Sequence, residues 1–433
     1  MINNISAARF QMGYSLGFHM IFAALGVGMP ALMLIAEALW LRSRKPEYQK
    51  LAQTWAKATG LLFAIGAVSG TALSFELGLL WPRFMAFAGG TIGPAFTLEG
   101  YAFFTEAIFL GLYLYGWERL SGPAHWFSGL VVALSGAASS ILVVAADAWM
   151  QTPVGVQDLI SRPQTFNAAR ALFTNEAWWI MSIHSTLACY AATAFAAAGV
   201  YAWGAVVRGR KDDLRMRALA ICMAVGVISA VAMPITGHES AISVARRQPN
   251  KLASMESLFR TQRGAPLLVG GIPDPAHQRV LFGIEIPKGL SFLATFNPNA
   301  EVQGLDRVPR DEWPNLYVTH FSFQAMVGAG MITMLVAIWY WIAARRRNGT
   351  KDNRLLQWAL VVCSPLGFVS LEAGWIVTEV GRQPWIIYRV MRTAAAVTPA
   401  QGIGGSVTGF IVLYTLLGVA LVWMLNRIKH PAA

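Results

Sequence analysis

Long apolar runs with almost no charge recur along this chain, and they restrict what it can fold into. Runs long enough to cross a bilayer can be drawn at nine places, namely 9–40, 54–81, 95–118, 124–148, 178–207, 214–236, 316–345, 355–379 and 407–427. About 20 apolar residues cross the hydrocarbon core as a helix. Lipid offers unpaired backbone groups no partner. The sequence therefore predicts an all-α fold, a polytopic transmembrane bundle of about nine helices.

The composition agrees with a membrane protein. Of the 433 residues, 55% are hydrophobic and only 13% are charged, whereas a soluble domain carries roughly 25% charged residues. The net charge of +12 is spread over short basic runs between the apolar ones. This distribution is typical of membrane topology, and it argues against nucleic-acid binding.

The basic runs predict the orientation. They follow the first, fifth and seventh runs and end the chain: Arg42, Arg44, Lys45 and Lys50; Arg208, Arg210, Lys211, Arg215 and Arg217; Arg345, Arg346, Arg347, Lys351 and Arg354; Arg427 and Lys429. All fall on one side if odd-numbered helices run inward, so the positive-inside rule places the N-terminus outside and the C-terminus in the cytoplasm. The start, MINNISAARF, lacks the basic region of a signal peptide, so we expect the first run to remain as a helix.

Three regions follow from this pattern. Residues 1–236 would form six spanning helices, 237–315 a long polar loop on the outer side, and 316–433 three more helices. A loop of this length between tightly connected helices is more often functional than passive.

Several ionisable residues lie inside the apolar runs: His19, Glu99, Glu106, His184 and Glu379. A charge at mid-membrane costs about 2.5–3.5 kcal/mol, so each needs a reason. Any one of them could simply bond a neighbouring helix. The derived topology, however, places His19, Glu99, His184 and Glu379 in the outer half, at the level of the long loop, which favours a cofactor site there.

The residue types point to heme. Histidine is the usual axial ligand of b-type hemes, and methionine is a common second ligand. Met326, in HFSFQAMVGAG, has glycines nearby that would let a flat macrocycle approach, although Met326 alone is more readily a core residue. His320 in the same motif is a rival ligand.

One motif is specific enough to indicate a family. Residues 374–385 read GWIVTEVGRQPW, which closely resembles the signature of cytochrome bd quinol oxidase subunit I. Similar matches occur in order along the chain: LEGYAFFTE, WMQTPVG, QPNKLASMES and FSFQAMVGAGM.

The resemblance implies three hemes. His184 and Met326 would be the iron ligands of a low-spin heme b. His19 and Glu379 would serve two high-spin hemes, one a heme b and the other a heme d or a further heme b, with Glu99 as another ligand or a near neighbour.

The resemblance also implies roles for polar residues around the hemes. Lys251 and Glu256 in the outer loop match the quinol-associated pair. Trp375 and Arg382 would pack against the hemes and support them electrostatically. A proton path from the cytoplasm would use Glu106, together with the inner-side residues Lys57 and Glu118.

The implied activity is that of a terminal oxidase. It would oxidise ubiquinol or menaquinol at the outer face of the bacterial cytoplasmic (inner) membrane. It would reduce O2 to water with electrogenic proton uptake from the cytoplasm. Expected partners are subunit II of the oxidase and small single-helix subunits.

Some residues depart from the family pattern. Gln324 stands where many members carry Arg, and Asp147 and Thr152, at and near WMQTPVG, are atypical. The outer loop is of the short type, which resembles a cyanide-insensitive branch. The identity of the third heme therefore stays open.

Two alternatives remain at this stage. A heme b electron-transfer subunit that never meets oxygen would need only His184 and Met326, and would leave Glu99, Glu379 and Arg382 unexplained. A proton-coupled transporter would use the buried acids and contain broken helices, of which Gly28–Pro30 is a weak hint.

Overall fold

The computed structural model describes residues 3–209, 211–346 and 349–427; Arg210, Arg347 and Lys429 of the predicted basic runs lie outside these ranges. Within them, nine helices are long and apolar enough to cross a membrane. The nine spans are α1 (Asn4–Ser43), α2 (Pro46–Leu80), α3 (Pro82–Tyr115), α4 (Gly122–Gln151), α7 (Glu176–Val207), α8 (Asp213–Arg247), α11 (Leu316–Ala344), α12 with α13 (Arg354–Cys363 and Leu366–Val380) and α15 (Ile403–Arg427). The predicted helical membrane bundle is confirmed.

The remaining elements are short. They comprise α5 (Val156–Ser161), α6 (Ala168–Phe173), α9 (Pro249–Met255), α10 (Gly289–Thr295), α14 (Thr393–Ala396), the 3-10 turns Leu305–Arg307 and Arg310–Glu312, and strands β1 (Gln262–Arg263), β2 (Leu267–Val269), β3 (Ile272–Asp274), β4 (Arg279–Leu281), β5 (Ile284–Ile286), β6 (Glu301–Val302), β7 (Trp385–Ile387) and β8 (Met391–Arg392). The strands pair antiparallel as β1 with β6, β2 with β5, β3 with β4 and β7 with β8.

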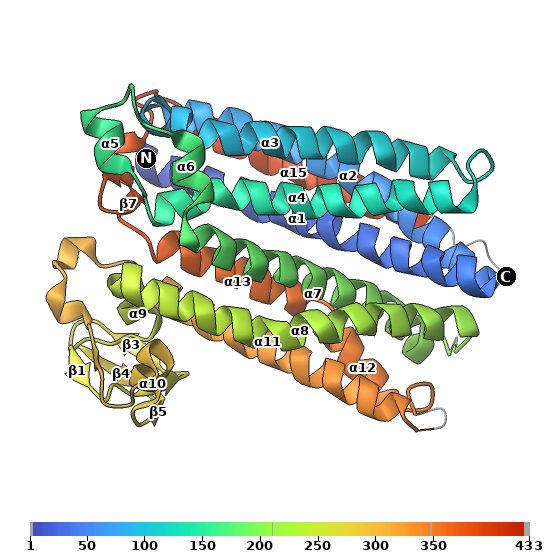
Figure 1. Cartoon of the computed structure of the whole chain (residues 1–433). Helices are drawn as coiled ribbons and strands as arrows, with labels where there is room; N and C mark the ends of the chain where they lie inside the picture. Colours follow the sequence, from blue (N-terminus) through green and yellow to red (C-terminus); the bar gives the residue numbers. More distant parts are fainter. Residues whose placement is uncertain (1–2, 210, 347–348, 428–433) are drawn as a thin grey trace.

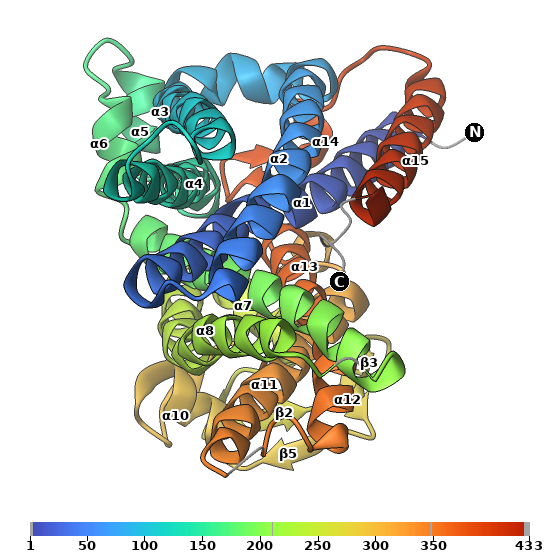
Figure 2. The same ribbon diagram turned by 90° about the vertical axis from the view of Figure 1, so that its right-hand side faces the viewer.

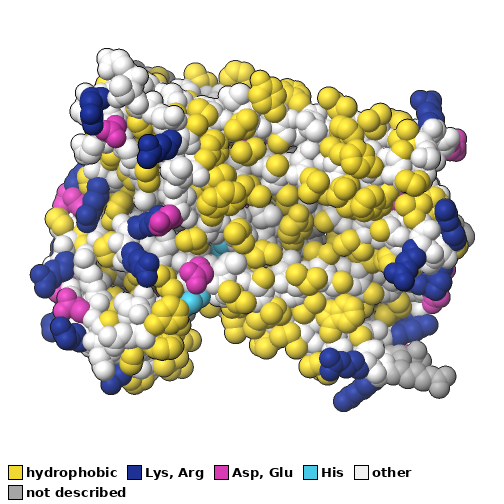
Figure 3. Space-filling model, viewed as in Figure 1, with side chains coloured by type: hydrophobic (Ala, Val, Ile, Leu, Met, Phe, Trp, Pro, Cys, Tyr) yellow, Lys and Arg dark blue, Asp and Glu magenta, His cyan; other side chains and the backbone are white. Residues whose placement is uncertain are grey.

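The spanning helices lie side by side (Figure 1). One end of the bundle carries the start of α1 and residues 248–315; we call it the loop end. Hydrophobic side chains cover the middle of the visible face, and Lys, Arg, Asp and Glu side chains gather at its two ends (Figure 3). This banding is what a bilayer requires of a multi-pass protein.

The sixth span is longer than the apolar run that predicts it. It was expected to end at 236, but α8 continues to Arg247. The extra turns, GHESAISVARR, are polar because they leave the hydrocarbon, and their Ala, Glu, Ser and Arg residues still suit a helix. The non-helical connection therefore begins at Gln248.

Small residues set the helix packing. A Cβ at Gly28 would overlap the side chain of Thr193 on α7, and the Thr193 hydroxyl donates to the Ala24 carbonyl at 3.0 Å. Close approach of helices at glycine is common in membranes. Helix α1 is continuous through Gly28–Pro30, so it lacks the break that the transporter alternative would require there. Among the described residues, the eighth span is interrupted at Ser364 and Pro365.

The connection after α8 has its own apolar core. Leu252, Phe259, Leu290 and Leu305 are buried together with Leu316, the first residue of α11. This core holds α9 and the small hairpins against the loop end of the bundle (Figure 1).

Candidate functional site

His184, on α7, is held in place by a hydroxyl on the neighbouring helix. Its Nδ1 lies 2.9 Å from the hydroxyl oxygen of Thr236 on α8. A Cβ at Gly237 would stand 3.3 Å from the imidazole Cε1, so glycine leaves room for the ring. A bond from one ring nitrogen to a hydroxyl fixes the ring and leaves the other, Nε2, as the candidate iron ligand.

Met326, on α11, faces α13. The Ser370 hydroxyl donates to the Met326 carbonyl at 2.9 Å. A Cβ built at Gly374 would lie only 3.0 Å from the Met326 sulfur. Glycine at position 374 therefore leaves the space that the Met326 thioether occupies.

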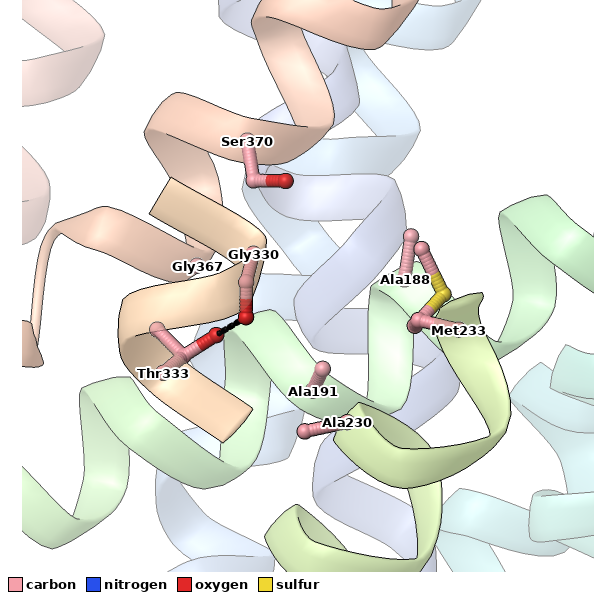
Figure 4. A pocket seen from close by; sticks show the side chains of 8 residues that line it. All are labelled: Ala188, Ala191, Ala230, Met233, Gly330, Thr333, Gly367 and Ser370. Carbon is pink, nitrogen blue, oxygen red and sulfur yellow. Dashed lines mark hydrogen bonds between the residues drawn. The ribbon is translucent and has the colours of Figure 1, made fainter. Parts of the chain in front are cut away.

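A small cavity lies between the helices that carry these two residues. It measures about 20 Å³ and is lined by side chains of α7, α8, α11 and α13 (Figure 4). Its lining includes Ala188, one turn beyond His184, and Gly330, one turn beyond Met326. The lining residues other than Met233 are small, so their side chains leave this gap between the four helices unfilled.

His19, on α1, has similar surroundings. Its Nδ1 lies 3.0 Å from the hydroxyl oxygen of Ser69 on α2, and a Cβ at Gly70 would stand 3.0 Å from its Cε1. Glu372 lies on α13, one turn before Trp375 and two turns before Glu379. One of its carboxylate oxygens is 3.5 Å from a Cβ built at Gly17 of α1. His19 and the acidic face of α13 thus border the same part of the bundle.

Two acids follow one face of α3. Glu99 accepts a hydrogen bond from the Ser139 hydroxyl on α4 at 2.8 Å. Glu106, two turns further, is buried, and one of its oxygens would lie 3.4 Å from a Cβ at Gly136 on α4. Its other oxygen has no hydrogen-bond partner among the described residues.

Arg382, just after α13, is almost fully buried at 2% exposure. Its guanidinium donates to the Asp147 carboxylate at 3.1 Å and to the Glu379 carboxylate at 2.5 Å. The side chain thus links the loop ends of α4 and α13. Trp375 is partly buried one turn before Glu379 on the same face of α13.

Gln151, the last residue of α4, connects Arg382 to the loop. The Lys251 ammonium donates to the Gln151 side-chain oxygen at 2.6 Å, and the Gln248 amide donates to the same oxygen at 3.0 Å. The Gln151 amide nitrogen in turn donates to Asp147 at 3.2 Å. A continuous chain of hydrogen bonds therefore runs from Lys251 to Arg382 and Glu379.

The two loop residues expected to meet quinol are both buried. Lys251 is 4% exposed and Glu256 is 5% exposed. Burial, assisted by the Arg382 charge, lowers the pKa of Lys251 to about 7. Burial raises the pKa of Glu256 to about 7, although its carboxylate accepts from the Leu268 backbone N–H at 3.3 Å. Both groups can therefore change protonation near neutral pH.

His320, the rival iron ligand from α11, lies against the loop. Its Nδ1 lies 2.8 Å from the Met255 carbonyl oxygen, and its Nε2 lies 3.2 Å from the Gly270 carbonyl oxygen. Both ring nitrogens thus face backbone of the loop. The geometry favours Met326 over His320 as the ligand from α11.

The donor set suits heme. Two imidazoles are each oriented by a hydroxyl through Nδ1, and a thioether sits against a glycine. Axial histidine and methionine ligands with oriented outer partners are what heme iron takes from a protein. Lys57 and Glu118, in contrast, are exposed at the end opposite the loop.

The sequence missed the residues that orient the site. Gln151 lies within WMQTPVG, so the motif contained a signal that could have been used. Thr236 and Ser69 gave none, because a Thr or Ser in a spanning helix usually bonds its own backbone.

Comparison with known proteins identifies the family of the chain. Residues 7–431 match the family model described as cytochrome bd terminal oxidase subunit I. A Bacillus subtilis (strain 168) chain named "Putative cytochrome bd menaquinol oxidase subunit I" is 36% identical over 439 residues, covering 99% of this chain and 98% of that one. "Cytochrome bd ubiquinol oxidase subunit 1" of the same organism is 29% identical over 442 residues, covering 98% and 93%.

A solved structure is similar over nearly the whole length. The bd oxidase from Geobacillus thermodenitrificans superposes with a TM-score of 0.91 at 34% identity, covering 98% of both chains. The chain therefore belongs to the cytochrome bd terminal oxidase subunit I family.

Proposed function

We propose that this chain oxidises quinol at its loop end and passes the electrons to hemes held in that half of the bundle. The observation that carries the proposal is the hydrogen-bond chain through Gln151. It joins Lys251 of the loop to Arg382 and Glu379 at the end of α13. Substrate and cofactor regions are therefore parts of one polar network.

Lys251 and Glu256 would divide the work on quinol. Quinol oxidation releases two electrons and two protons. A carboxylate whose pKa is about 7 is suited to accept a proton at neutral pH. The Lys251 ammonium would hold a quinol oxygen while Gln151 positions it.

The other site residues would hold the hemes. His184 and Met326 would ligate a low-spin heme b. His19 and Glu379 would serve two high-spin hemes, a heme b and either a heme d or a further heme b, with Glu99 beside them. When bound, these groups carry electrons from quinol to oxygen. Arg382 and Trp375 would stabilise them by charge and by packing.

Protons for oxygen reduction would come from the other side. Glu106 is buried two turns from Glu99, towards the end opposite the loop, and is the candidate relay, with Lys57 and Glu118 at the surface of that end. The basic runs favour a cytoplasmic location for that end and for the C-terminus, with the N-terminus outside. Charge would then cross the membrane without a pump.

The setting follows from the family. We place the chain in a bacterial cytoplasmic membrane, in a complex with subunit II. Its candidate substrates are menaquinol and ubiquinol, which occur in the names of relatives. Single-helix subunits would be further partners. The transporter alternative predicts a colourless protein, whereas this proposal predicts heme absorption.

The test uses the purified oxidase complex. Replacing Glu256 with Ala should slow quinol oxidation at least tenfold and leave oxygen binding to the chemically reduced enzyme unchanged. Glu301→Ala, an exposed acid on β6 of the same loop, is the matched control. Equal quinol oxidation rates in the two variants would contradict the assignment. Separately, His184→Ala should remove the low-spin heme spectrum from a protein that still inserts.

A further inference from the structure

The loop between α8 and α11 carries an apolar surface that no part of the described chain covers. We call it the loop patch. It consists of six large hydrophobic residues that are each 45–90% exposed, namely Ile272, Phe282, Ile284, Ile286, Phe292 and Phe296. Contiguous apolar surface of this kind marks a site of contact with lipid or protein.

Two residues of the loop patch have a strained backbone conformation. Phe282 and Phe296 have φ angles of +59° and +58°, in the left-handed region that bulky residues avoid. Phe282 is also 90% exposed. A strained turn that presents a phenyl ring to water would be doubly unfavourable. An apolar medium around the ring removes the second penalty.

The patch lies on the side of the loop that faces the membrane. Hydrophobic side chains cover the part of the loop next to the spanning helices, and charged side chains cover its far side (Figure 3). Both ribbon views place β5 beyond α11, at the edge of the bundle (Figures 1 and 2). The loop therefore overhangs the region that lipid would fill.

Hydrogen bonds to α11 set the depth of the hairpins. Gln324 accepts from the Gly270 backbone N–H at 2.9 Å and donates to the Leu268 carbonyl at 3.1 Å. Gln324 lies about 12 Å along the axis from the start of α11 at a rise of 1.5 Å per residue. The helix exceeds a hydrocarbon core of about 30 Å by roughly 7 Å at each end. The turn at Gly270 therefore lies roughly 5 Å inside the edge of the hydrocarbon at the loop end.

The patch adjoins α8, which also exposes apolar side chains. The Phe296 ring packs edge-on against His238 of α8, with centroids 5.1 Å apart. On the same helix, Ile228 and Ile235 are 69% and 66% exposed. Apolar side chains are thus exposed both on this spanning helix and on the adjoining loop, with an acidic and a histidine side chain between the two surfaces (Figure 3).

We propose that the loop patch is immersed in the adjacent leaflet, so that phospholipid is its occupant and the hairpins anchor the loop in the membrane. The inference rests on the proposed function in one respect. Strand β2 carries Leu268, whose N–H bonds Glu256. The anchored strand would then hold the proton acceptor beside the phase that supplies quinol.

The test measures lipid contact directly, on the whole oxidase complex in phospholipid nanodiscs. Cys189, Cys222 and Cys363 are replaced by Ala, and a fluorophore is attached at Phe282→Cys. The control is Arg263→Cys on β1, an exposed site on the far side of the loop (Figure 1). Nitroxide-labelled phospholipid and a water-soluble nitroxide serve as the two quenchers.

Three outcomes decide the matter. Severalfold stronger quenching by the lipid nitroxide at position 282 than at 263 is the expected result. Quenching at 282 by the water-soluble nitroxide alone would overturn the proposal. Protection of 282 from both quenchers would also overturn it, since a protein chain would then cover the patch. The readout does not need turnover, so a failed quinol assignment would not alter it.

Discussion

The Gln151 side chain offers the sharpest test of the link between loop and bundle. Replacing it with Leu keeps the size but removes the oxygen that accepts from the Lys251 ammonium at 2.6 Å. Lys251 is 4% exposed, so water cannot readily replace the lost partner. We therefore expect the ammonium to be destabilised while the fold is retained.

The expected change in the pKa of Lys251 follows from the strength of the bond to Gln151. A hydrogen bond to a charged group contributes about 1.5–3 kcal/mol, and 1.36 kcal/mol corresponds to one pKa unit. The substitution should lower the pKa of Lys251, already about 7, by a further 1–2 or so. At neutral pH the charged fraction would fall from roughly half to below about a tenth, and the KM for quinol would rise about tenfold.

The assay is steady-state quinol oxidation by the complex as a function of pH. Wild type should lose affinity for quinol as pH rises through about 7, because Lys251 loses its proton, and Gln151→Leu should lose it at lower pH. Gln151→Glu should shift the profile the opposite way, since a carboxylate stabilises the ammonium. Gln157→Leu, at an exposed position on α5, is the control. A Gln151→Leu profile identical to that of the control would refute the reasoning.

Three further predictions concern other parts of the site. We expect wild-type kcat/KM to fall below about pH 7 as the Glu256 carboxylate is protonated, and Glu256→Gln should abolish this fall in the same pH series; an unchanged acid limb would exclude Glu256 as the base. Gly374→Ala should alter the low-spin heme spectrum, because its Cβ would stand 3.0 Å from the Met326 sulfur, whereas Gly328→Ala on α11 meets no atom within 4 Å and should not. Glu106→Gln should slow proton uptake by the reduced enzyme, followed with a pH dye after mixing with oxygen, at least tenfold without changing the KM for quinol; rapid uptake would rule it out as the relay.

The fold was largely predictable because the signal for each span is local. Apolar runs identify helices wherever lipid surrounds them, and all nine appear. The errors have local causes as well. Helix α8 outlasts its apolar run because polar residues remain helical above the membrane. The loop hairpins escaped prediction because strands of two or three residues are too short to show an alternating pattern.

The site was predictable only in part. The candidate ligands His19, His184 and Met326 stood out by type and by motif. Their orienting partners Ser69 and Thr236 lie on other helices, 50 and 52 residues away in sequence. No periodicity reveals which hydroxyl meets which ring, since that depends on how the helices pack.

Two of the three residues that depart from the family pattern, Gln324 and Asp147, are explained by this packing, whereas nothing in the structure explains Thr152. At position 324 an Arg could only donate, so it would leave the Gly270 N–H without its acceptor. Gln324 both accepts from Gly270 and donates to Leu268. Asp147 neutralises charge on Arg382, which is otherwise paired only with Glu379 among the described residues. A missing cation and an added carboxylate both make the loop end more negative. Each favours the oxidised, more positive state of a nearby heme, so the two changes should lower heme reduction potentials together.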